Sequence, residues 1–247
     1  MAWLRWGLIH NTPLMSIHPS LLTQFSLLKH LSPSVLEDLA KGSNLCSFAK
    51  REVILDKNEH PLWLFFLLEG RLQATDFTVD GKEDCLYFIE EGEAFGQICV
   101  IDGLKSPEIL IANKKSQVVM VPSEVIRPIL LTEPPITESV LLDLAHRVRI
   151  QGEQRQILGI NNPLQRVCSQ LLLLLKHSRP ATRGDSTQMQ ALAQAPTHQE
   201  LAMMVNLSRE TVTRVFQVLQ SKSVLDRQAD HLLINPELLQ QLANSGE

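Results

Sequence analysis

Cysteine is scarce in this sequence and is not arranged for metal or disulfide chemistry. The four copies form no CxxC pair and have no histidine at short spacing: Cys46, Cys85, Cys99 and Cys168. Zinc sites and disulfide frameworks need closely spaced ligands or paired thiols. We therefore expect four buried, reduced thiols, with no metal site and no cofactor.

Long apolar runs are also missing. The longest, residues 62–68 and 171–175, fall far short of the roughly 20 residues that a membrane span needs. The first residues, MAWLRWGLIHNTPLMS, lack a small-residue cleavage site after an apolar core, so they make a poor secretory signal. We expect a cytoplasmic protein without a membrane segment. Residues 1–15 are either an extension before a start at Met15 or an ordered arm.

The chain has no excess of positive charge, since 23 Lys and Arg stand against 27 Asp and Glu. Eight of the basic residues and seven of the acidic ones lie from residue 162 onward, so the acidity is concentrated in the N-terminal part. A surface that contacts nucleic acid would then be small, and its affinity would depend on dimerisation. No glycine-rich phosphate loop, nucleophile elbow or close carboxylate pair indicates an enzyme.

What is present is a strong two-helix pattern in residues 196–225, PTHQELAMMVNLSRETVTRVFQVLQSKSVL. Thr197 with Glu200 forms a capping box that predicts a helix start at Thr197. The apolar spacing breaks at Asn206, a residue type that tolerates a left-handed turn. Ser208 then caps a second helix, which runs to about residue 220 and buries an apolar stripe: Val212, Val215, Phe216 and Leu219.

The other face of this second helix carries residue types that can read DNA bases. It presents Arg209, Glu210, Thr213, Arg214 and Gln217. Arg pairs with guanine O6 and N7, and Glu accepts from cytosine N4. The residues alone leave open an ordinary solvated face with charge pairs at i,i+3 or i,i+4.

The segment SRETVTR resembles the recognition helix of the Crp/Fnr family of bacterial transcription regulators, in particular its catabolite-activator branch. The resemblance implies a homodimer on double-stranded DNA with a palindrome of TGTGA half-sites, and RNA polymerase as a further partner. Arg209 and Arg214 would contact guanines and Glu210 the cytosine side. Residues at phosphate-holding positions are Gln199, Ser208, Thr211 and Thr213, whereas His198 stands where a basic residue is common.

Residues 45–122 contain short Val-, Ile-, Leu- and Phe-rich segments separated by evenly spaced glycines, which favours a β-roll. Asp80-Gly81 is a hairpin signal. Residues 64–97 resemble the cyclic-nucleotide-binding β-roll of the same family. We therefore expect an α+β protein with a β-roll over residues 16–133, a dimerisation helix over 134–161 and a winged helix-turn-helix over 162–247.

The effector pocket that this resemblance implies is degenerate. Where the family has a Gly-Glu pair for the ribose and an Arg-Ser pair for the cyclic phosphate, this chain has Gly96-Gln97 and Lys105-Ser106. Gln151-Gly152 replaces the hydroxyl pair that meets the adenine. We expect no control by cyclic AMP. A different small effector in the roll or at the dimer helix remains the alternative.

Elements around these motifs are predicted from spacing. After Pro134-Pro135, a 3,4-stepped seam predicts a coiled coil: Leu141, Leu144, Val148, Gln151, Arg155 and Leu158. Polar Gln151 and Arg155 favour a register-setting role over ligand contact. Asn161-Asn162-Pro163 predicts a hinge before a helix over 164–176. A loop or short hairpin is expected over 178–196, a two-stranded wing at 224–225 and 232–234, and a last helix from Asn235-Pro236.

Overall fold

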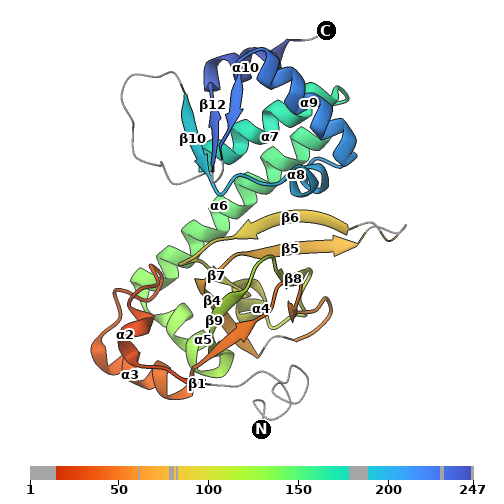
Figure 1. Ribbon diagram of the computed structural model, residues 1–247. Helices are drawn as coiled ribbons and strands as arrows, with labels where there is room; N and C mark the ends of the chain where they lie inside the picture. Colours follow the sequence, from red (N-terminus) through yellow and green to blue (C-terminus); the bar gives the residue numbers. More distant parts are fainter. Residues whose placement is uncertain are drawn as a thin grey trace. The chain divides into compact units, whose positions relative to one another are not determined.

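The computed structural model describes residues 15–60, 62–77, 81, 83–177, 189–228 and 231–245. The chain divides into two compact units, Met1–Ala145 and His146–Glu247 (Figure 1). The division falls inside one continuous helix, α6 (Pro134–Leu158).

The first unit contains two antiparallel sheets that form the expected roll. The five-stranded sheet has the order β1-β2-β9-β4-β7, with β1 (Met15–Ser16), β2 (Asn44–Phe48), β9 (Ser116–Pro122), β4 (Trp63–Glu69) and β7 (Ala94–Phe95). The four-stranded sheet has the order β3-β8-β5-β6, with β3 (Val53–Leu55), β8 (Ile109–Ala112), β5 (Leu72–Phe77) and β6 (Glu83–Ile89).

The sequence of strand β4, WLFFLLE, is apolar at nearly every position because both faces of the strand are buried. Successive side chains of a strand point to opposite faces, and both faces of β4 are covered. Phe65 lies in the core between the two sheets and stacks on Phe95 at 4.9 Å between ring centroids. Phe66 points to the other side, where it packs on Phe25 at 4.8 Å.

This second apolar layer is supplied by helices of the first unit. They are α2 (Pro19–Leu22), α3 (Pro33–Gly42), α5 (Ser123–Thr132) and the first half of α6. The Ser32 hydroxyl accepts from Val35 N and caps the start of α3. Helix α4 (Gln97–Asp102) packs against α5 and β4.

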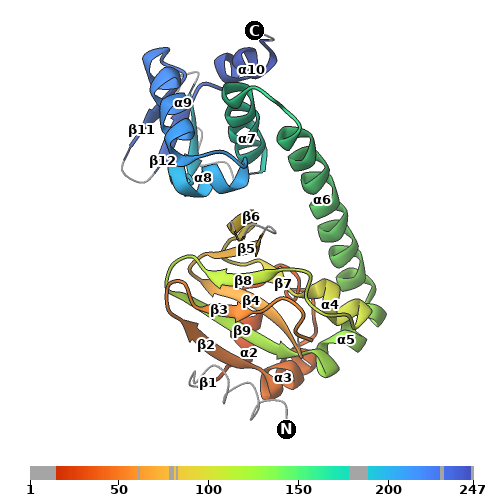
Figure 2. The ribbon, with the colours of Figure 1, turned by 90° about the vertical axis from the view of Figure 1, so that its right-hand side faces the viewer.

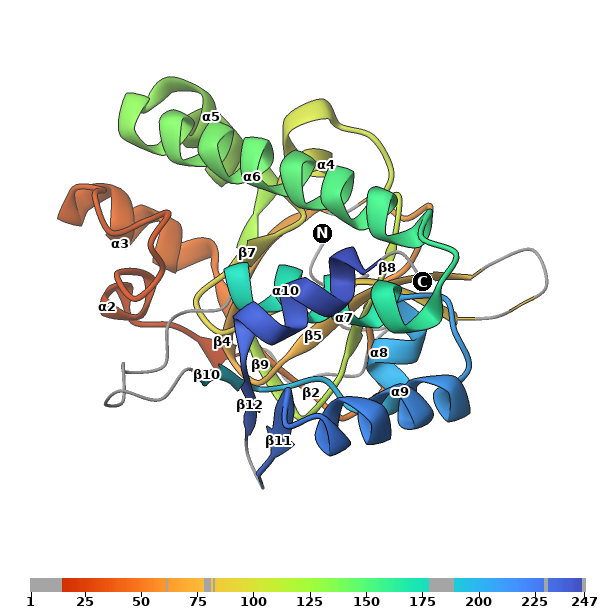
Figure 3. The same cartoon turned by 90° about the horizontal axis from the view of Figure 1, so that it is seen from above.

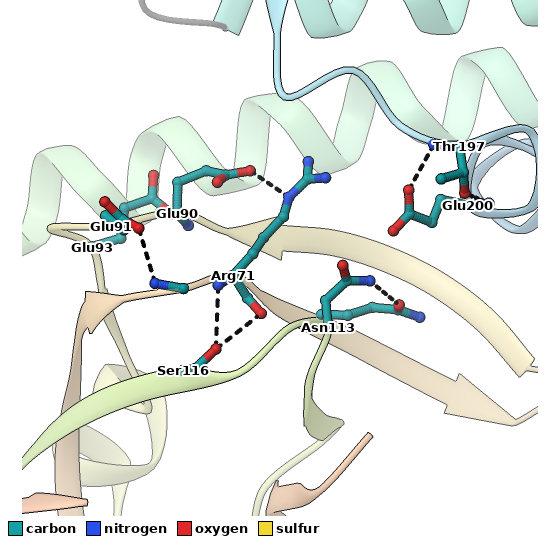
Figure 4. A network of polar contacts seen from close by, with 10 residues as sticks. Arg71, Glu90, Glu91, Glu93, Asn113, Ser116, Thr197 and Glu200 are labelled. Carbon is teal, nitrogen blue, oxygen red and sulfur yellow. Dashed lines mark hydrogen bonds and ion pairs between the residues drawn. The ribbon is translucent and has the colours of Figure 1, made fainter. Parts of the chain in front are cut away.

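The glycines that punctuate the roll adopt backbone conformations that L side chains avoid. Gly70 has φ +113°, and a Cβ there would lie 2.3 Å from the Ser116 hydroxyl oxygen. Figure 4 shows the polar contacts around this turn: Glu91 accepts from Gly70 N at 2.9 Å, and Arg71 Nε donates to Glu90 at 2.7 Å. Gly81 has φ +78°, as a primed turn requires; Asp80 lies outside the described residues.

The second unit packs helices on a small sheet. The helices are the second half of α6, α7 (Pro163–His177), α8 (His198–Met204), α9 (Arg209–Ser221) and α10 (Pro236–Asn244). The sheet has the order β10-β12-β11, from β10 (Gln190–Ala193), β11 (Leu225–Arg227) and β12 (His231–Ile234). Figure 3 shows α9 beside β11, which it contacts.

The expected wing is thus present but has a third strand. Strand β10 pairs with β12 over four residues, from Gln190 opposite Ile234 to Ala193 opposite His231. The sequence QALA alternates too weakly to distinguish a strand from the expected loop or hairpin, and pairing with β12 decides the matter. Ala229 and Asp230, which lie between the two predicted strands of the wing, are outside the described residues.

Candidate nucleic-acid interface

Helix α8 begins as the capping box predicts. The Thr197 hydroxyl accepts from Glu200 N at 3.2 Å, and the Glu200 carboxylate accepts from Thr197 N at 2.7 Å. The second of these contacts is drawn in Figure 4. Both bonds satisfy backbone donors that a helix N-terminus leaves unpaired, so the start of the first helix is fixed at Thr197.

The turn between α8 and α9 is a Schellman motif centred on Asn206, whose φ is +49°. Leu207 N donates to Ala202 O at 3.0 Å and Asn206 N donates to Met203 O at 3.4 Å. These two bonds satisfy carbonyls at the end of α8. Asparagine adopts this left-handed conformation at modest cost. The break predicted at Asn206 is therefore confirmed by its φ angle. The chain turns there into α9 (Figure 2).

Helix α9 buries one face and exposes the other. Ser208 caps it by accepting from Thr211 N at 3.1 Å. The predicted stripe is buried in full: Val212, Val215, Phe216 and Leu219. On the opposite face Arg209, Glu210 and Arg214 are exposed to solvent, which leaves their charged groups available to base edges in a major groove.

The exposed groups of α9 are partly ordered by one another. Arg214 Nη2 donates to the Thr211 hydroxyl at 3.4 Å, and that hydroxyl lies 2.9 Å from Ser208 Oγ. The backbone N–H of Glu210 itself and then the Ser208 hydroxyl hold the pKa of the Glu210 carboxyl below its usual value. Glu210 is therefore an ionised hydrogen-bond acceptor at neutral pH.

Thr213, one of the predicted phosphate ligands, is engaged inside the domain. Its hydroxyl donates to Arg209 O at 2.9 Å and lies 3.0 Å from His198 Nδ1. Since a hydroxyl has one proton, Thr213 accepts from His198, which places the proton of the neutral imidazole on Nδ1. A phosphate contact by Thr213 would have to compete with the Arg209 carbonyl, whereas Gln199 on α8 is exposed.

His198 is also held by packing. Its ring lies 4.4 Å from that of Phe216 between centroids. Burial, then the positive charges of Arg227 and Arg209, lower the pKa of His198 below its ordinary value. The position therefore supplies no full positive charge at neutral pH. Arg227 itself donates to Pro196 O at 3.3 Å, which joins the wing to the segment before α8.

In the first unit, Gln97 of the expected effector pocket is used structurally. Gly96 precedes α4 with φ +85°. Gln97 is 5% exposed, and its Nε2 donates to Asp143 Oδ2 of α6 at 2.9 Å. An amide has no negative charge to offer a ribose hydroxyl, and this one already has a partner.

Ser106, at the expected phosphate position, is likewise satisfied by its own chain. It is 3% exposed, and its hydroxyl donates to Glu108 O at 2.8 Å. The Glu108 carboxylate accepts from the Tyr87 hydroxyl, so this segment carries an acidic residue where a phosphate ligand would need basic ones. Lys105 is exposed. Gln151 and Gly152 are exposed residues of α6 in the second unit.

The predicted seam of α6 is unevenly exposed. Leu141, Val148 and Leu158 are 61%, 68% and 37% exposed, and Arg155 is exposed as well. Leu144 instead packs against the core of the first unit. Ala145 and Gly152 are exposed between these positions, so the stripe of Leu141, Ala145, Val148, Gly152 and Arg155 also steps by four and three. The predicted seam, which consists of larger residues, does not include these two small ones.

The four thiols are free and buried, as expected. Burial raises the pKa of Cys46 and of Cys168 to about 12. Among the described residues, no three His, Cys, Asp or Glu side chains are grouped as metal ligands. No helix in the described ranges is long and apolar enough to cross a bilayer.

Each of the two units contains a segment that matches a known domain family. Residues 45–133 match the cyclic nucleotide-binding domain, and residues 165–242 match the Crp-like helix-turn-helix domain. The cAMP-activated global transcriptional regulator CRP of Pasteurella multocida is 22% identical over 207 residues, which cover 82% of this chain and 97% of that protein.

Solved structures show the same fold. FixK2 from Bradyrhizobium japonicum superposes with a TM-score of 0.69 at 19% identity, over 83% of this chain and 99% of that one. The c-di-GMP responsive global regulator CLP of Xanthomonas campestris gives 0.63 at 18% identity, over 82% and 99%. The two domain matches in this order, together with relatives that span most of the chain, show that this protein is a DNA-binding transcription regulator of the Crp/Fnr family.

Proposed function

We propose that this chain acts as a homodimer that binds a palindrome of TGTGA-like half-sites and does so without cyclic AMP. The observation that carries the proposal is the exposed face of α9. Arg209, Glu210 and Arg214 lie free of the core on a helix whose N-terminus is capped and whose opposite face is fully buried. Arg for guanine and Glu for cytosine supply the donors and acceptors that G·C pairs of such a site require.

Phosphate contacts would position this face on the duplex. Gln199 at the start of α8, and Ser208 and Thr211 at the start of α9, are the side chains that support such a role. The N-terminus of α9 adds backbone N–H groups and the positive end of its dipole. Thr213 would serve mainly by holding the first turn of α9 through the Arg209 carbonyl.

Dimerisation is supported by the apolar stripe on α6. Exposed Leu141 and Val148 lie two helical turns apart, with Ala145 and Gly152 allowing a second helix to approach closely. A parallel pair of α6 helices related by a two-fold axis would present two α9 helices to successive major grooves, roughly 34 Å apart. Arg155 would then set register near the end of the seam.

Independence from cyclic AMP is supported by how the pocket residues are used. Gln97 is bonded to Asp143, and Ser106 is bonded to the Glu108 carbonyl. A ligand would have to break these bonds and lie near the Glu108 carboxylate. Each hydrogen bond lost to a charged or buried group costs on the order of 1–3 kcal/mol. The changes at Gln97, at Lys105 and at Gln151-Gly152 would therefore together remove useful affinity.

A binding assay with purified protein tests the proposal. Fluorescence anisotropy at stated salt would compare a TGTGA palindrome with a scrambled duplex, with and without cyclic AMP. We expect at least about a 10³-fold preference for the palindrome, typical of specific sites, and no change on adding cyclic AMP. Equal binding to both duplexes would refute sequence-specific reading, and a cyclic-AMP-dependent shift would refute effector independence.

A regulator that answers to a different small effector is the second candidate. The relatives favour it in one respect: the similar proteins are described as cAMP-activated in one case and c-di-GMP responsive in another, so this fold serves chemically different ligands. Calorimetry with c-di-GMP, followed by the same DNA assay, separates the two candidates. RNA polymerase would be the partner through which either form regulates transcription in the cytoplasm.

A further inference from the structure

The end of helix α8 is completed by side chains that come from outside the helix-turn-helix. The Schellman turn satisfies the carbonyls of Ala202 and Met203, but it leaves those of Met204 and Val205. Gln154 Nε2, from α6, donates to Met204 O at 2.7 Å. Arg166 Nη1, from α7, donates to Val205 O at 3.0 Å.

Arg166 holds the connection between α6 and α7 at the same time. Its Nε donates to Ile160 O at 2.7 Å, while Nη1 also reaches Asn206 O at 3.5 Å. The planar guanidinium presents its donors in a fixed fork. One side chain therefore ties the α6–α7 connection to the turn that precedes the recognition helix. Gln154 and Arg166, with the carbonyls they bind, are called the carbonyl clamp below.

Charge favours this arrangement as well as geometry. The C-terminus of a helix carries partial negative charge, and a cation placed there is stabilising. Both clamp side chains are half-buried, so their bonds compete less with water than bonds at an exposed surface would. Because bonds to carbonyls need defined directions, the clamp restrains the angle of α8 and α9 to α6 and not only their separation.

All parts of the clamp lie in the second compact unit, together with Val148, Gly152 and Arg155 of the proposed dimer stripe and with α9. We propose that Gln154 and Arg166 are positioning residues that fix the recognition helix relative to the dimer axis and so determine which distance between half-sites the dimer accepts. This inference rests on the proposed dimeric, sequence-specific binding.

The physical reason is that a change of one base pair in the gap between the half-sites changes both their distance and their relative orientation. One added base pair moves a half-site by about 3.4 Å along the axis and turns it by roughly 35°. A dimer with a fixed angle between α6 and α9 engages both half-sites at one spacing only, and avidity is lost where simultaneous engagement is impossible. If the angle between α6 and α9 is less restrained, the two DNA-binding domains of the dimer can adapt to several gaps between half-sites.

The test compares duplexes in which the gap between two identical half-sites changes by one base pair at a time, up to two in either direction. We expect the wild-type protein to prefer one gap by about tenfold or more. Arg166→Gln and Gln154→Leu should each reduce this preference to about threefold or less. Their affinity for a duplex with a single half-site should stay at the wild-type value, because the α9 face is untouched.

Gln165→Leu is the matched control, since Gln165 also donates to a helix-end carbonyl, that of Ser245, but connects α7 to α10 only. It should keep the wild-type gap profile. Circular dichroism checks folding, and Gln154→Leu alone decides the question if Arg166→Gln does not fold. A selective wild-type protein whose clamp variants keep the same profile overturns the clamp. A wild-type protein that binds every gap alike overturns the proposed dimeric function instead.

Discussion

The side-chain amide of Gln97 donates to the carboxylate of Asp143 across 2.9 Å, and this bond joins α4 to the long helix α6 inside the first unit. A position that the family resemblance assigns to ligand binding is thus part of the fold.

Replacing Gln97 with Glu should weaken the protein and should not create a cyclic-AMP site. Two carboxylates would lie within hydrogen-bond distance at a buried position, and we expect the free energy of unfolding at neutral pH to fall by about 1–3 kcal/mol. Gln97→Met, which removes the bond without adding charge, should cost less. Thermal unfolding measures both, and calorimetry measures cyclic AMP. Micromolar cyclic-AMP binding by Gln97→Glu would contradict this account of the pocket.

Base reading by α9 predicts position-specific losses. Arg209→Ala and Arg214→Ala should each cost roughly 1–3 kcal/mol of DNA-binding free energy and relax the preference at one base position. Lys222, exposed after the end of α9, is the matched cation, and Lys222→Ala should leave base preference intact. Binding to a library of half-site variants measures each profile. A uniform loss over all sequences would instead identify the arginines as phosphate ligands.

The dimer stripe can be tested with two apolar residues of similar exposure. Val148 and Leu142 are 68% and 65% exposed, but only Val148 lies on the stripe with Leu141 and Gly152. We expect Val148→Glu to give monomers at micromolar concentration, because a like charge from each copy would meet at the seam, and Leu142→Glu to remain dimeric. Sedimentation velocity distinguishes the two. Dimers from both variants would place the interface elsewhere.

His198 predicts a loss of stability in mild acid. Burial first, then Arg227 and Arg209, lower its pKa in the folded state, so the unfolded chain binds more protons once the pH falls below about 6.5. The stability gained by keeping His198 neutral is present above that pH and is lost as the pH falls toward the lowered folded value.

The measurement is denaturant unfolding at about pH 7.5 and about pH 5.5. His198→Gln should show a smaller acid-induced loss than the wild-type protein. His30→Gln, at an exposed position of the first unit, serves as the control and should lose as much as wild type. A His198→Gln protein with an unchanged pH dependence would show that this imidazole is not responsible.

Local rules were sufficient for the helix-turn-helix. The capping box at Thr197, the left-handed break at Asn206 and the Ser208 cap depend on bonds between residues at most five apart along the chain. The same holds for the buried stripe of α9, whose spacing follows from one helix. These features are visible in sequence because the partner groups are neighbours in sequence.

Features that depend on distant partners were not predictable. Strand β10 exists because it pairs with β12, about 40 residues away along the chain. The Gln97 bond to Asp143 and the bonds of Gln154 and Arg166 to the end of α8 likewise join segments 39 to 50 residues apart. Polar residues of this kind look like surface residues in sequence, and only the fold reveals that their hydrogen-bonding groups are used.

The buried thiols give each unit its own reporter of opening. Cys46 belongs to the core of the first unit and Cys168 to that of the second, and both have a pKa of about 12. The thiolate is the form that reacts with alkylating reagents, so labelling of either residue has to wait until its surroundings unfold. Mass spectrometry of an alkylation time course would therefore report the opening of the two units separately, in one sample and without an engineered label.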